Sequence, residues 1–223
     1  MKTVDNAPRY LGAAFLFVLV ASVLGSALSG ASAGTGDMSS TFAGIADHPG
    51  LYRGGILAEL ATGIGIVVLA VLLHEVLGRR HRLLARVALG WWLAEGVILC
   101  VSQVGAYATI LVSDRYAGAT AAEKPALLAL GDALYNGVEK SGYSIHMLFY
   151  CVGALVWFAL FAATDLVPRP LALWGLIAET VALVGILVVL SGAQVSILVF
   201  AHIALLELAI GLWLVRKGRT AKQ

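Results

Sequence analysis

The sequence predicts an all-α fold, a bundle of six transmembrane helices, and three observations support this. Of the 223 residues, 60% are hydrophobic and only 13% are charged, which is too little polar surface for a soluble domain. Six apolar runs are long enough to cross a hydrocarbon core of about 30 Å as helices. None alternates with the period of two that barrel strands require, so lipid leaves only the helix to satisfy the backbone. We expect residues 1–223 to form a single integral membrane domain.

The predicted helices follow the apolar runs in order. They lie near 10–30, 52–77, 84–112, 143–164, 171–191 and 194–215. Basic residues precede the first run, as in a secretory signal, but the run is long for such a signal and we expect a retained helix. The Gly-, Ser- and Asp-rich segment 29–50 favours turns that lie over the membrane surface.

The connection between the third and fourth helices contains a further helical pattern. Four apolar residues recur there at helical spacing: Leu127, Leu130, Leu134 and Val138. We predict a short amphipathic helix over 124–139 in the outer loop, placed as a lid. Thr120 and Glu123 have the spacing of a capping box, but Pro125 lies too deep for a helix that starts at Thr120. The helix should therefore begin near Lys124.

The basic residues orient the bundle with both the N-terminus and the C-terminus in the cytoplasm. In this orientation eleven of the fifteen lysines and arginines lie on the cytoplasmic side and four on the outer side. The eleven are Lys2, Arg9, Arg79, Arg80, Arg82, Arg86, Arg169, Arg216, Lys217, Arg219 and Lys222. This asymmetry follows the positive-inside rule. It also explains the net charge of +2 without a nucleic-acid partner.

An internal similarity suggests a three-plus-three inverted repeat. GILAELATGIGIVVL at 55–69 aligns with GLIAETVALVGILVV at 175–189. The two helices should cross the membrane in opposite directions, as an inverted repeat requires. The same relation pairs Glu59 with Glu179, and roughly pairs Glu95 with Glu207. Chance similarity between apolar helices is the alternative.

The four glutamates of this comparison lie inside predicted spans. A charged side chain at a helix centre costs on the order of 3 kcal/mol, so we expect these carboxyl groups to face the bundle interior. We predict a polar pocket in the outer half of the membrane, with Glu59 and Glu95 as the acid and stabilising groups. The other predicted ligand-binding residues are Arg53, Trp92, Gln103, His146, Tyr150, Glu179, His202 and Glu207.

Several of these residues have a purely structural alternative. Arg53 can extend to the outer interface, and the two histidines can be core imidazoles bonded to hydroxyl groups. No HxxxH or ExxH spacing is present, so no metal site is predicted. Cys100 and Cys151 are expected to be small buried hydrophobic residues. The sequence identifies no cofactor.

Four segments resemble a family of bacterial membrane proteins. They are LYRGGILAEL, LLARVALGWWLAEG, GYSIHMLFYCVGALVWFALF and LVPRPLALWGLIAE. Over about Tyr10 to Leu190 the chain is similar to the family catalogued as domain of unknown function 4386. The recognisable points are Arg53, the segment 86–95, Gly142–Tyr143 and the turn at Pro168–Arg169. The resemblance implies about six helices in the bacterial inner membrane and supplies no activity.

Three functions remain open at the level of the sequence. The first is binding of a lipophilic small molecule, with acid–base transformation of it in the pocket; whether the protein is an enzyme is therefore undecided. The second is a small proton-coupled transporter, working as a homodimer and using the glutamates as a relay. The third is a subunit or scaffold of a membrane complex. Membrane lipids are the partners common to all three.

Overall fold

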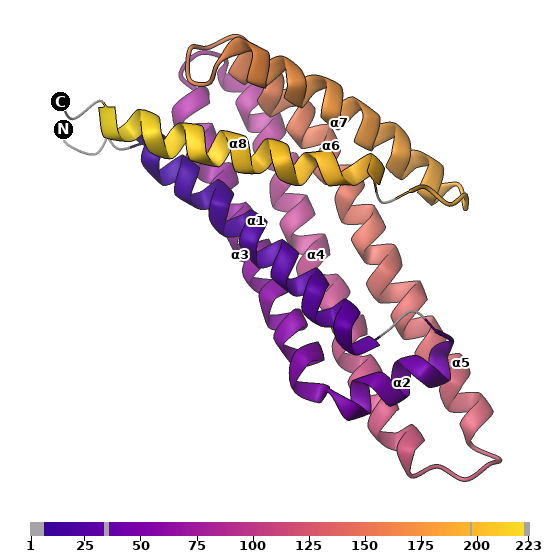
Figure 1. Ribbon diagram of the computed structural model, residues 1–223. Coiled ribbons are helices and arrows are strands. Elements are labelled where there is room, and N and C mark those ends of the chain that lie inside the picture. The colour runs from indigo at the N-terminus through magenta and orange to yellow at the C-terminus, as the bar shows by residue number, and fades with distance from the viewer. Residues whose placement is uncertain (1–6, 34–35, 197, 221–223) are drawn as a thin grey trace. The chain divides into compact units, whose positions relative to one another are not determined.

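The computed structural model describes residues 7–33, 36–196 and 198–220, and within these ranges every regular element is a helix (Figure 1). The elements are α1 (Ala7–Ala33), α2 (Met38–Asp47), α3 (Pro49–Leu77), α4 (Arg82–Ala117), α5 (Lys124–Leu134), the π-helix η1 (Tyr135–Lys140), α6 (Ser141–Ala162), α7 (Arg169–Leu190) and α8 (Leu198–Thr220). The all-α fold predicted from the sequence is confirmed. Lys2 and Lys222, two of the eleven basic residues assigned to the cytoplasmic side, lie outside the described residues.

Six helical stretches are long and apolar enough to cross a membrane. They are α1, α3, α4, the continuous run from α5 through η1 to α6, α7, and α8. Each contains one of the six predicted apolar runs or nearly all of it, and most extend a few residues beyond it. The chain is thus an integral membrane protein with six apolar spans. The cytoplasmic position of the termini and the inverted repeat stay predictions.

The segment between the first two spans differs from the predicted turns, because residues 38–47 form α2. The carboxylate of Asp37 caps this helix and accepts a hydrogen bond from the Ser40 amide at 2.9 Å. That bond, together with those from nearby serine hydroxyls, lowers the pKa of Asp37 below its usual value. Phe42 and Ile45 are buried on one side of α2. A cap and two apolar anchors thus overcome the turn preference of the Gly- and Ser-rich surroundings.

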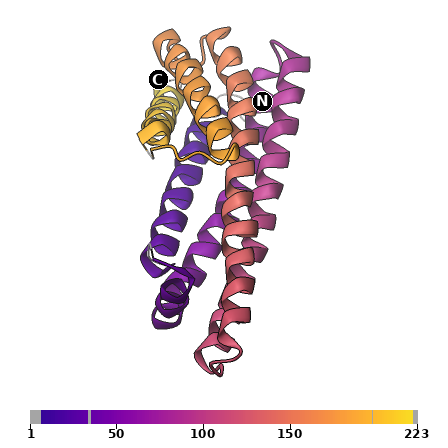
Figure 2. The ribbon, with the colours of Figure 1, turned by 90° about the vertical axis from the view of Figure 1, so that its right-hand side faces the viewer.

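The helix predicted between the third and fourth spans begins at Lys124, as predicted, with proline in its first turn. The Thr120 hydroxyl and amide donate to the Glu123 carboxylate at 2.6 and 2.8 Å, which lowers the pKa of Glu123. This pair closes a turn that precedes the helix. The helix does not end before the fourth span: α5 passes through η1 into α6 without a break (Figure 2).

The helices belong to two compact units. The first comprises the described residues of Met1–Leu19, Ile64–Gly96 and Ser144–Gln223, and the second those of Val20–Gly63 and Val97–Tyr143. Four helices, α1, α3, α4 and α6, contribute residues to both units. The single domain expected from the sequence stays a prediction.

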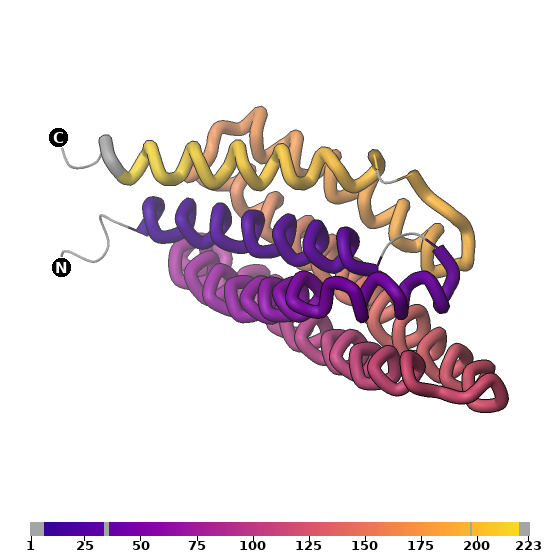
Figure 3. The backbone as a smooth tube through the Cα atoms, turned by 60° about the horizontal axis from the view of Figure 1, so that its bottom comes forward, coloured from indigo at the N-terminus to yellow at the C-terminus, as the bar shows by residue number. Residues whose placement is uncertain are grey.

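In the first unit, α8 packs closely on both α7 and the first half of α1 (Figure 3). A Cβ atom added to Gly12 would lie 2.6 Å from the Gly211 carbonyl oxygen, so the α1 and α8 backbones approach too closely for a side chain. Lipid supplies no hydrophobic driving force between helices. Small residues stabilise such a contact because they let the two backbones pack closely. This close contact helps to fix α8, which carries one of the glutamates discussed below.

The second unit has its own core. Its buried residues are Ala33, Ile45, Tyr52, Ile56, Ala106 and Ile110. They come from α1, α2, α3 and α4. Tyr52 is completely buried in this cluster.

Candidate functional site

Three glutamates and one tyrosine lie together in the first unit, and we call them the carboxyl cluster. Its members are Glu95 on α4, Tyr150 on α6, Glu179 on α7 and Glu207 on α8. The Tyr150 hydroxyl lies 3.0 Å from Oε1 of Glu179 and 3.1 Å from Oε1 of Glu207. Because the hydroxyl has one proton, it donates to one of these two carboxyl groups at a time. The third carboxyl group, of Glu95, interacts electrostatically with both other glutamates.

Most of the carboxyl cluster is buried. Glu95 is 2% exposed and Glu179 is fully buried, whereas Glu207 is partly exposed. Oε2 of Glu95 and Oε2 of Glu179 have no hydrogen-bond partner among the described residues. Buried polar atoms are nearly always satisfied in proteins, so these two oxygens require an explanation.

Aromatic rings hold the cluster's tyrosine in position. The Trp92 ring stacks on Tyr150 with 5.8 Å between centroids and 9° between planes, and Trp157 meets Trp92 edge-on at 6.0 Å. Trp92 Nε1 also donates to the Tyr150 carbonyl at 3.1 Å. A Cβ atom added to Gly153 would lie 2.4 Å from Trp92 Cδ1, so this contact needs glycine. The ring, the hydrogen bond and the glycine together fix the direction of the Tyr150 side chain.

Two histidines of the predicted pocket also belong to the first unit. His202 Nε2 lies 3.0 Å from the carbonyl oxygen of Ala178, the residue before Glu179. This contact is a hydrogen bond when Nε2 carries the proton, and it links α8 to α7 beside the carboxyl cluster. His146 is buried on α6, four residues before Tyr150.

The other predicted site residues belong to the second unit. Glu59 is 5% exposed and accepts a hydrogen bond from the Ser26 hydroxyl at 3.3 Å, while its Oε2 has no partner among the described residues. Gln103 is buried, and its Nε2 donates to the Ser102 hydroxyl at 3.3 Å. Arg53 is exposed and forms no ion pair with Glu59 in the part of the chain that the structure describes. The predicted combination of Glu59 and Glu95 as an acid pair stays a prediction.

One polar residue of the second unit, Glu139, was not among the predicted site residues. Its Oε2 accepts a hydrogen bond of 2.7 Å from the hydroxyl of the fully buried Tyr52. Glu139 lies in η1, where the wider helical turn changes which side chains share a face. The pattern of apolar residues over 124–139 assumes α-helical spacing, so it gave no indication of this contact.

Across the described ranges, no three His, Cys, Asp or Glu side chains are arranged to hold a metal ion. The two cysteines are free thiols; Cys151 is buried and Cys100 is half-buried.

A family model described as Domain of unknown function (DUF4386) matches residues 10–218. The chain belongs to this family. The resemblance noted in the sequence is thereby confirmed, and the matched DUF4386 region includes all four members of the carboxyl cluster. Comparison with curated proteins gave no match, nor did comparison with solved structures.

Proposed function

We propose that this protein is a small proton-coupled transporter, in which the carboxyl cluster binds and releases the coupling proton. The observation that carries the proposal is the Tyr150 hydroxyl, which lies within hydrogen-bond distance of two buried glutamates on different helices. The proposal includes a location in the bacterial inner membrane, where a proton gradient is available, and the predicted homodimer.

A proton is the ligand that best suits the cluster. Carboxylates that share a buried site repel one another, so three of them do not all remain ionised. A bound proton removes one charge and needs no cavity, which agrees with the packing of Trp92 against Gly153 beside Tyr150. The unpartnered oxygens of Glu95 and Glu179 are the atoms on which added protons would reside.

The position of the proton would also affect how the helices are held together. When Glu179 is protonated, the Tyr150 hydroxyl donates more favourably to an ionised Glu207, so the stronger, charge-assisted bond joins α6 to α8 and only a neutral bond can remain between α6 and α7. A ligand can shift a conformational equilibrium only if it binds two states with different affinities. The shared hydroxyl would give the proton this difference, because each protonation state favours a different pair of helices.

Transport also agrees with the internal similarity between 55–69 and 175–189. Inverted repeats are common in secondary transporters, which bind substrate and coupling ion near the membrane midplane. Glu179 lies in the second of these segments. If the repeat is real, the cluster lies where a coupling ion is usually bound.

Infrared spectroscopy can test proton binding directly. The carbonyl stretch of protonated carboxyl groups should titrate in the purified protein, and Glu179→Gln should remove part of that signal. Glu123→Gln is the matched control, because Glu123 is exposed and lies outside the cluster. A carbonyl signal that is the same in the wild type and in Glu179→Gln would exclude Glu179 as a proton site.

Flux measurements in proteoliposomes then test transport. An imposed pH gradient should drive uptake of at least one solute in a panel of organic cations, organic anions and neutral lipophilic compounds. Glu179→Gln should abolish that uptake, and Glu123→Gln should leave it unchanged. Proton titration without gradient-dependent flux of any compound would contradict transport while leaving proton binding in place.

A second candidate function, binding of a lipophilic molecule, is favoured by the surroundings of Glu59. The carboxyl group of Glu59 is buried, yet its hydrogen-bond donor Ser26 is exposed on a membrane-spanning helix. A hydroxylated lipophilic molecule could therefore reach the unpartnered Glu59 oxygen from the bilayer. Glu59→Gln should weaken photolabelling by such a compound, and equal labelling of both proteins would argue against this site.

A further inference from the structure

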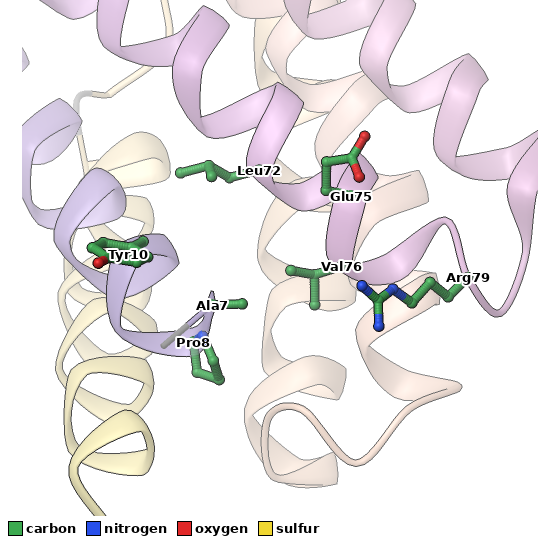
Figure 4. A pocket seen from close by; sticks show the side chains of 7 residues that line it. All are labelled: Ala7, Pro8, Tyr10, Leu72, Glu75, Val76 and Arg79. Carbon is green, nitrogen blue, oxygen red and sulfur yellow. The ribbon is translucent and has the colours of Figure 1, made fainter. Parts of the chain in front are cut away.

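The first unit contains a cavity between the beginning of α1 and the end of α3. None of its lining residues belongs to the carboxyl cluster. Its volume is about 390 Å³. The lining residues are Ala7, Pro8, Tyr10, Leu72, Glu75, Val76 and Arg79 (Figure 4). A volume of this size lies within the range of small-ligand sites.

One part of the cavity is apolar. Leu72 and Val76 come from the last turns of α3, and Pro8 and Tyr10 come from the first turn of α1. Both helices are membrane spans, so this apolar wall is continuous with the zone that lipid chains occupy.

The other part is charged. Glu75 lies in the last turn of α3 and Arg79 just beyond its end, four residues later. Figure 4 shows the Arg79 guanidinium group extending toward the α1 side of the cavity. Arg79 forms no ion pair or hydrogen bond with any other described residue, so its charge is available to a ligand.

The two charges of the cavity are not neutralised by each other. No ion pair joins Glu75 to Arg79 in the described part of the chain; Glu75 Oε1 instead lies 3.7 Å from His74 Nδ1. Arg79 lies in the turn after α3, so helical spacing does not hold it against Glu75. The cavity therefore offers both a positive and a negative group next to an apolar wall.

We infer that this cavity binds a phospholipid with an ethanolamine headgroup, with Arg79 holding the phosphate and Glu75 the ammonium group. An arginine fork matches phosphate geometry, and a primary ammonium can donate hydrogen bonds to a carboxylate. The acyl chains lie against Leu72 and Val76. Basic pockets between membrane-spanning helices commonly recognise lipid headgroups, and the glutamate here selects a headgroup that also carries a positive charge.

Choline and glycerol headgroups are the informative comparisons. A choline headgroup carries the same charges but has no N–H group to donate to Glu75. A glycerol headgroup has the phosphate but no positive charge, so the Glu75 carboxylate repels it. The site should thus prefer ethanolamine lipid to both of the others. This preference is independent of proton binding at the carboxyl cluster.

Lipid retention measured by mass spectrometry tests the inference. The purified full-length protein is equilibrated with mixed micelles containing equal amounts of phosphatidylethanolamine, phosphatidylcholine and phosphatidylglycerol, and the lipid that remains bound after detergent washing is identified. The wild type should retain phosphatidylethanolamine in about fivefold excess over each of the others, the factor expected for one additional favourable charge contact. Equal retention of the three lipids would overturn the inference.

Four variants separate the roles of the lining residues. Arg79→Gln should reduce retention of all three lipids about fivefold. Glu75→Gln should keep overall retention but remove the preference for phosphatidylethanolamine over phosphatidylglycerol. Val76→Phe should lower retention by filling the cavity without changing a charge. Arg86→Gln, an exposed arginine on α4 outside the cavity, is the control and should match the wild type.

The controls also define failure. If Arg86→Gln loses as much lipid as Arg79→Gln, the arginines attract lipid without a specific site, and the inference is wrong. Each variant is compared with the wild type by its unfolding temperature in lipid-free detergent. Because Glu75 and Arg79 are exposed, these temperatures should agree.

Discussion

Replacing Tyr150 with phenylalanine tests the central contact of the carboxyl cluster, because it removes one hydroxyl and keeps the ring that stacks on Trp92. The two oxygen–oxygen distances, 3.0 and 3.1 Å, are both hydrogen-bond distances. The hydroxyl proton makes one hydrogen bond at a time, so Tyr150→Phe removes the free energy of a single hydrogen bond. A bond to a charged group contributes about 1.5–3 kcal/mol, whereas bonds between side chains in membrane proteins average about 0.6 kcal/mol. The size of the loss therefore reports whether an ionised carboxylate accepts the bond.

We expect Tyr150→Phe to lower the free energy of unfolding by about 1.5–3 kcal/mol in mixed-micelle unfolding experiments near neutral pH. In a Glu179→Gln, Glu207→Gln background the acceptors are neutral amides, and the same change should cost only about 0.6 kcal/mol. The loss in the wild-type background should also shrink at acidic pH, as both carboxyl groups become protonated. Equal losses of about 0.6 kcal/mol in both backgrounds would refute the reasoning, because no charged acceptor would then be present.

Three further predictions concern local contacts. Gly153→Leu should displace the Trp92 ring and reduce the near-ultraviolet circular dichroism of the tryptophans; an unchanged spectrum would show that the ring does not need the glycine. Gly90→Ala in α4, where an added methyl group meets nothing within 4 Å, should instead stabilise the protein by up to about 1 kcal/mol in the same unfolding assay. The cap of α2 should persist below the usual pKa of aspartate and be lost only as the pH falls through the lowered pKa of Asp37, seen as lower amide protection factors in α2 after correction for the intrinsic exchange rate at each pH. Asp37→Asn should retain the cap without this loss, and protection factors that still fall with pH in that variant would assign the effect to another group.

Apolar length made the six spans predictable, because a helix is the conformation that satisfies the backbone in lipid whatever the side chains are. Apolar length does not predict α2, because this helix is too short and too polar to be a span. Its signal was present but local: a capping aspartate at Asp37, followed by apolar residues at Phe42 and Ile45. The abundance of glycine and serine around them indicated turns and outweighed it.

The candidate site shows a similar limit. The cost of burying a charge in lipid predicted that Glu95, Glu179 and Glu207 face the bundle interior, and the three carboxyl groups do interact. That cost does not say which faces of two helices meet, so the hydroxyl of Tyr150 between Glu179 and Glu207 could not be predicted. The contact between Tyr52 and Glu139 was hidden for another reason, since a π-helical turn does not follow the spacing from which helix faces are read.

Two of the helical stretches are much longer than a bilayer needs. The 36 residues of α4 and the 39 residues from Lys124 to Ala162 correspond to about 54 and 58 Å of helix, against a hydrocarbon core of about 30 Å. Tilting shortens the excess but does not remove it. Part of each stretch therefore extends beyond the hydrocarbon core as ordered helix. An antibody fragment that binds such a helical extension would recognise ordered helix rather than a loop, which is the kind of epitope that electron cryomicroscopy of a small membrane protein needs.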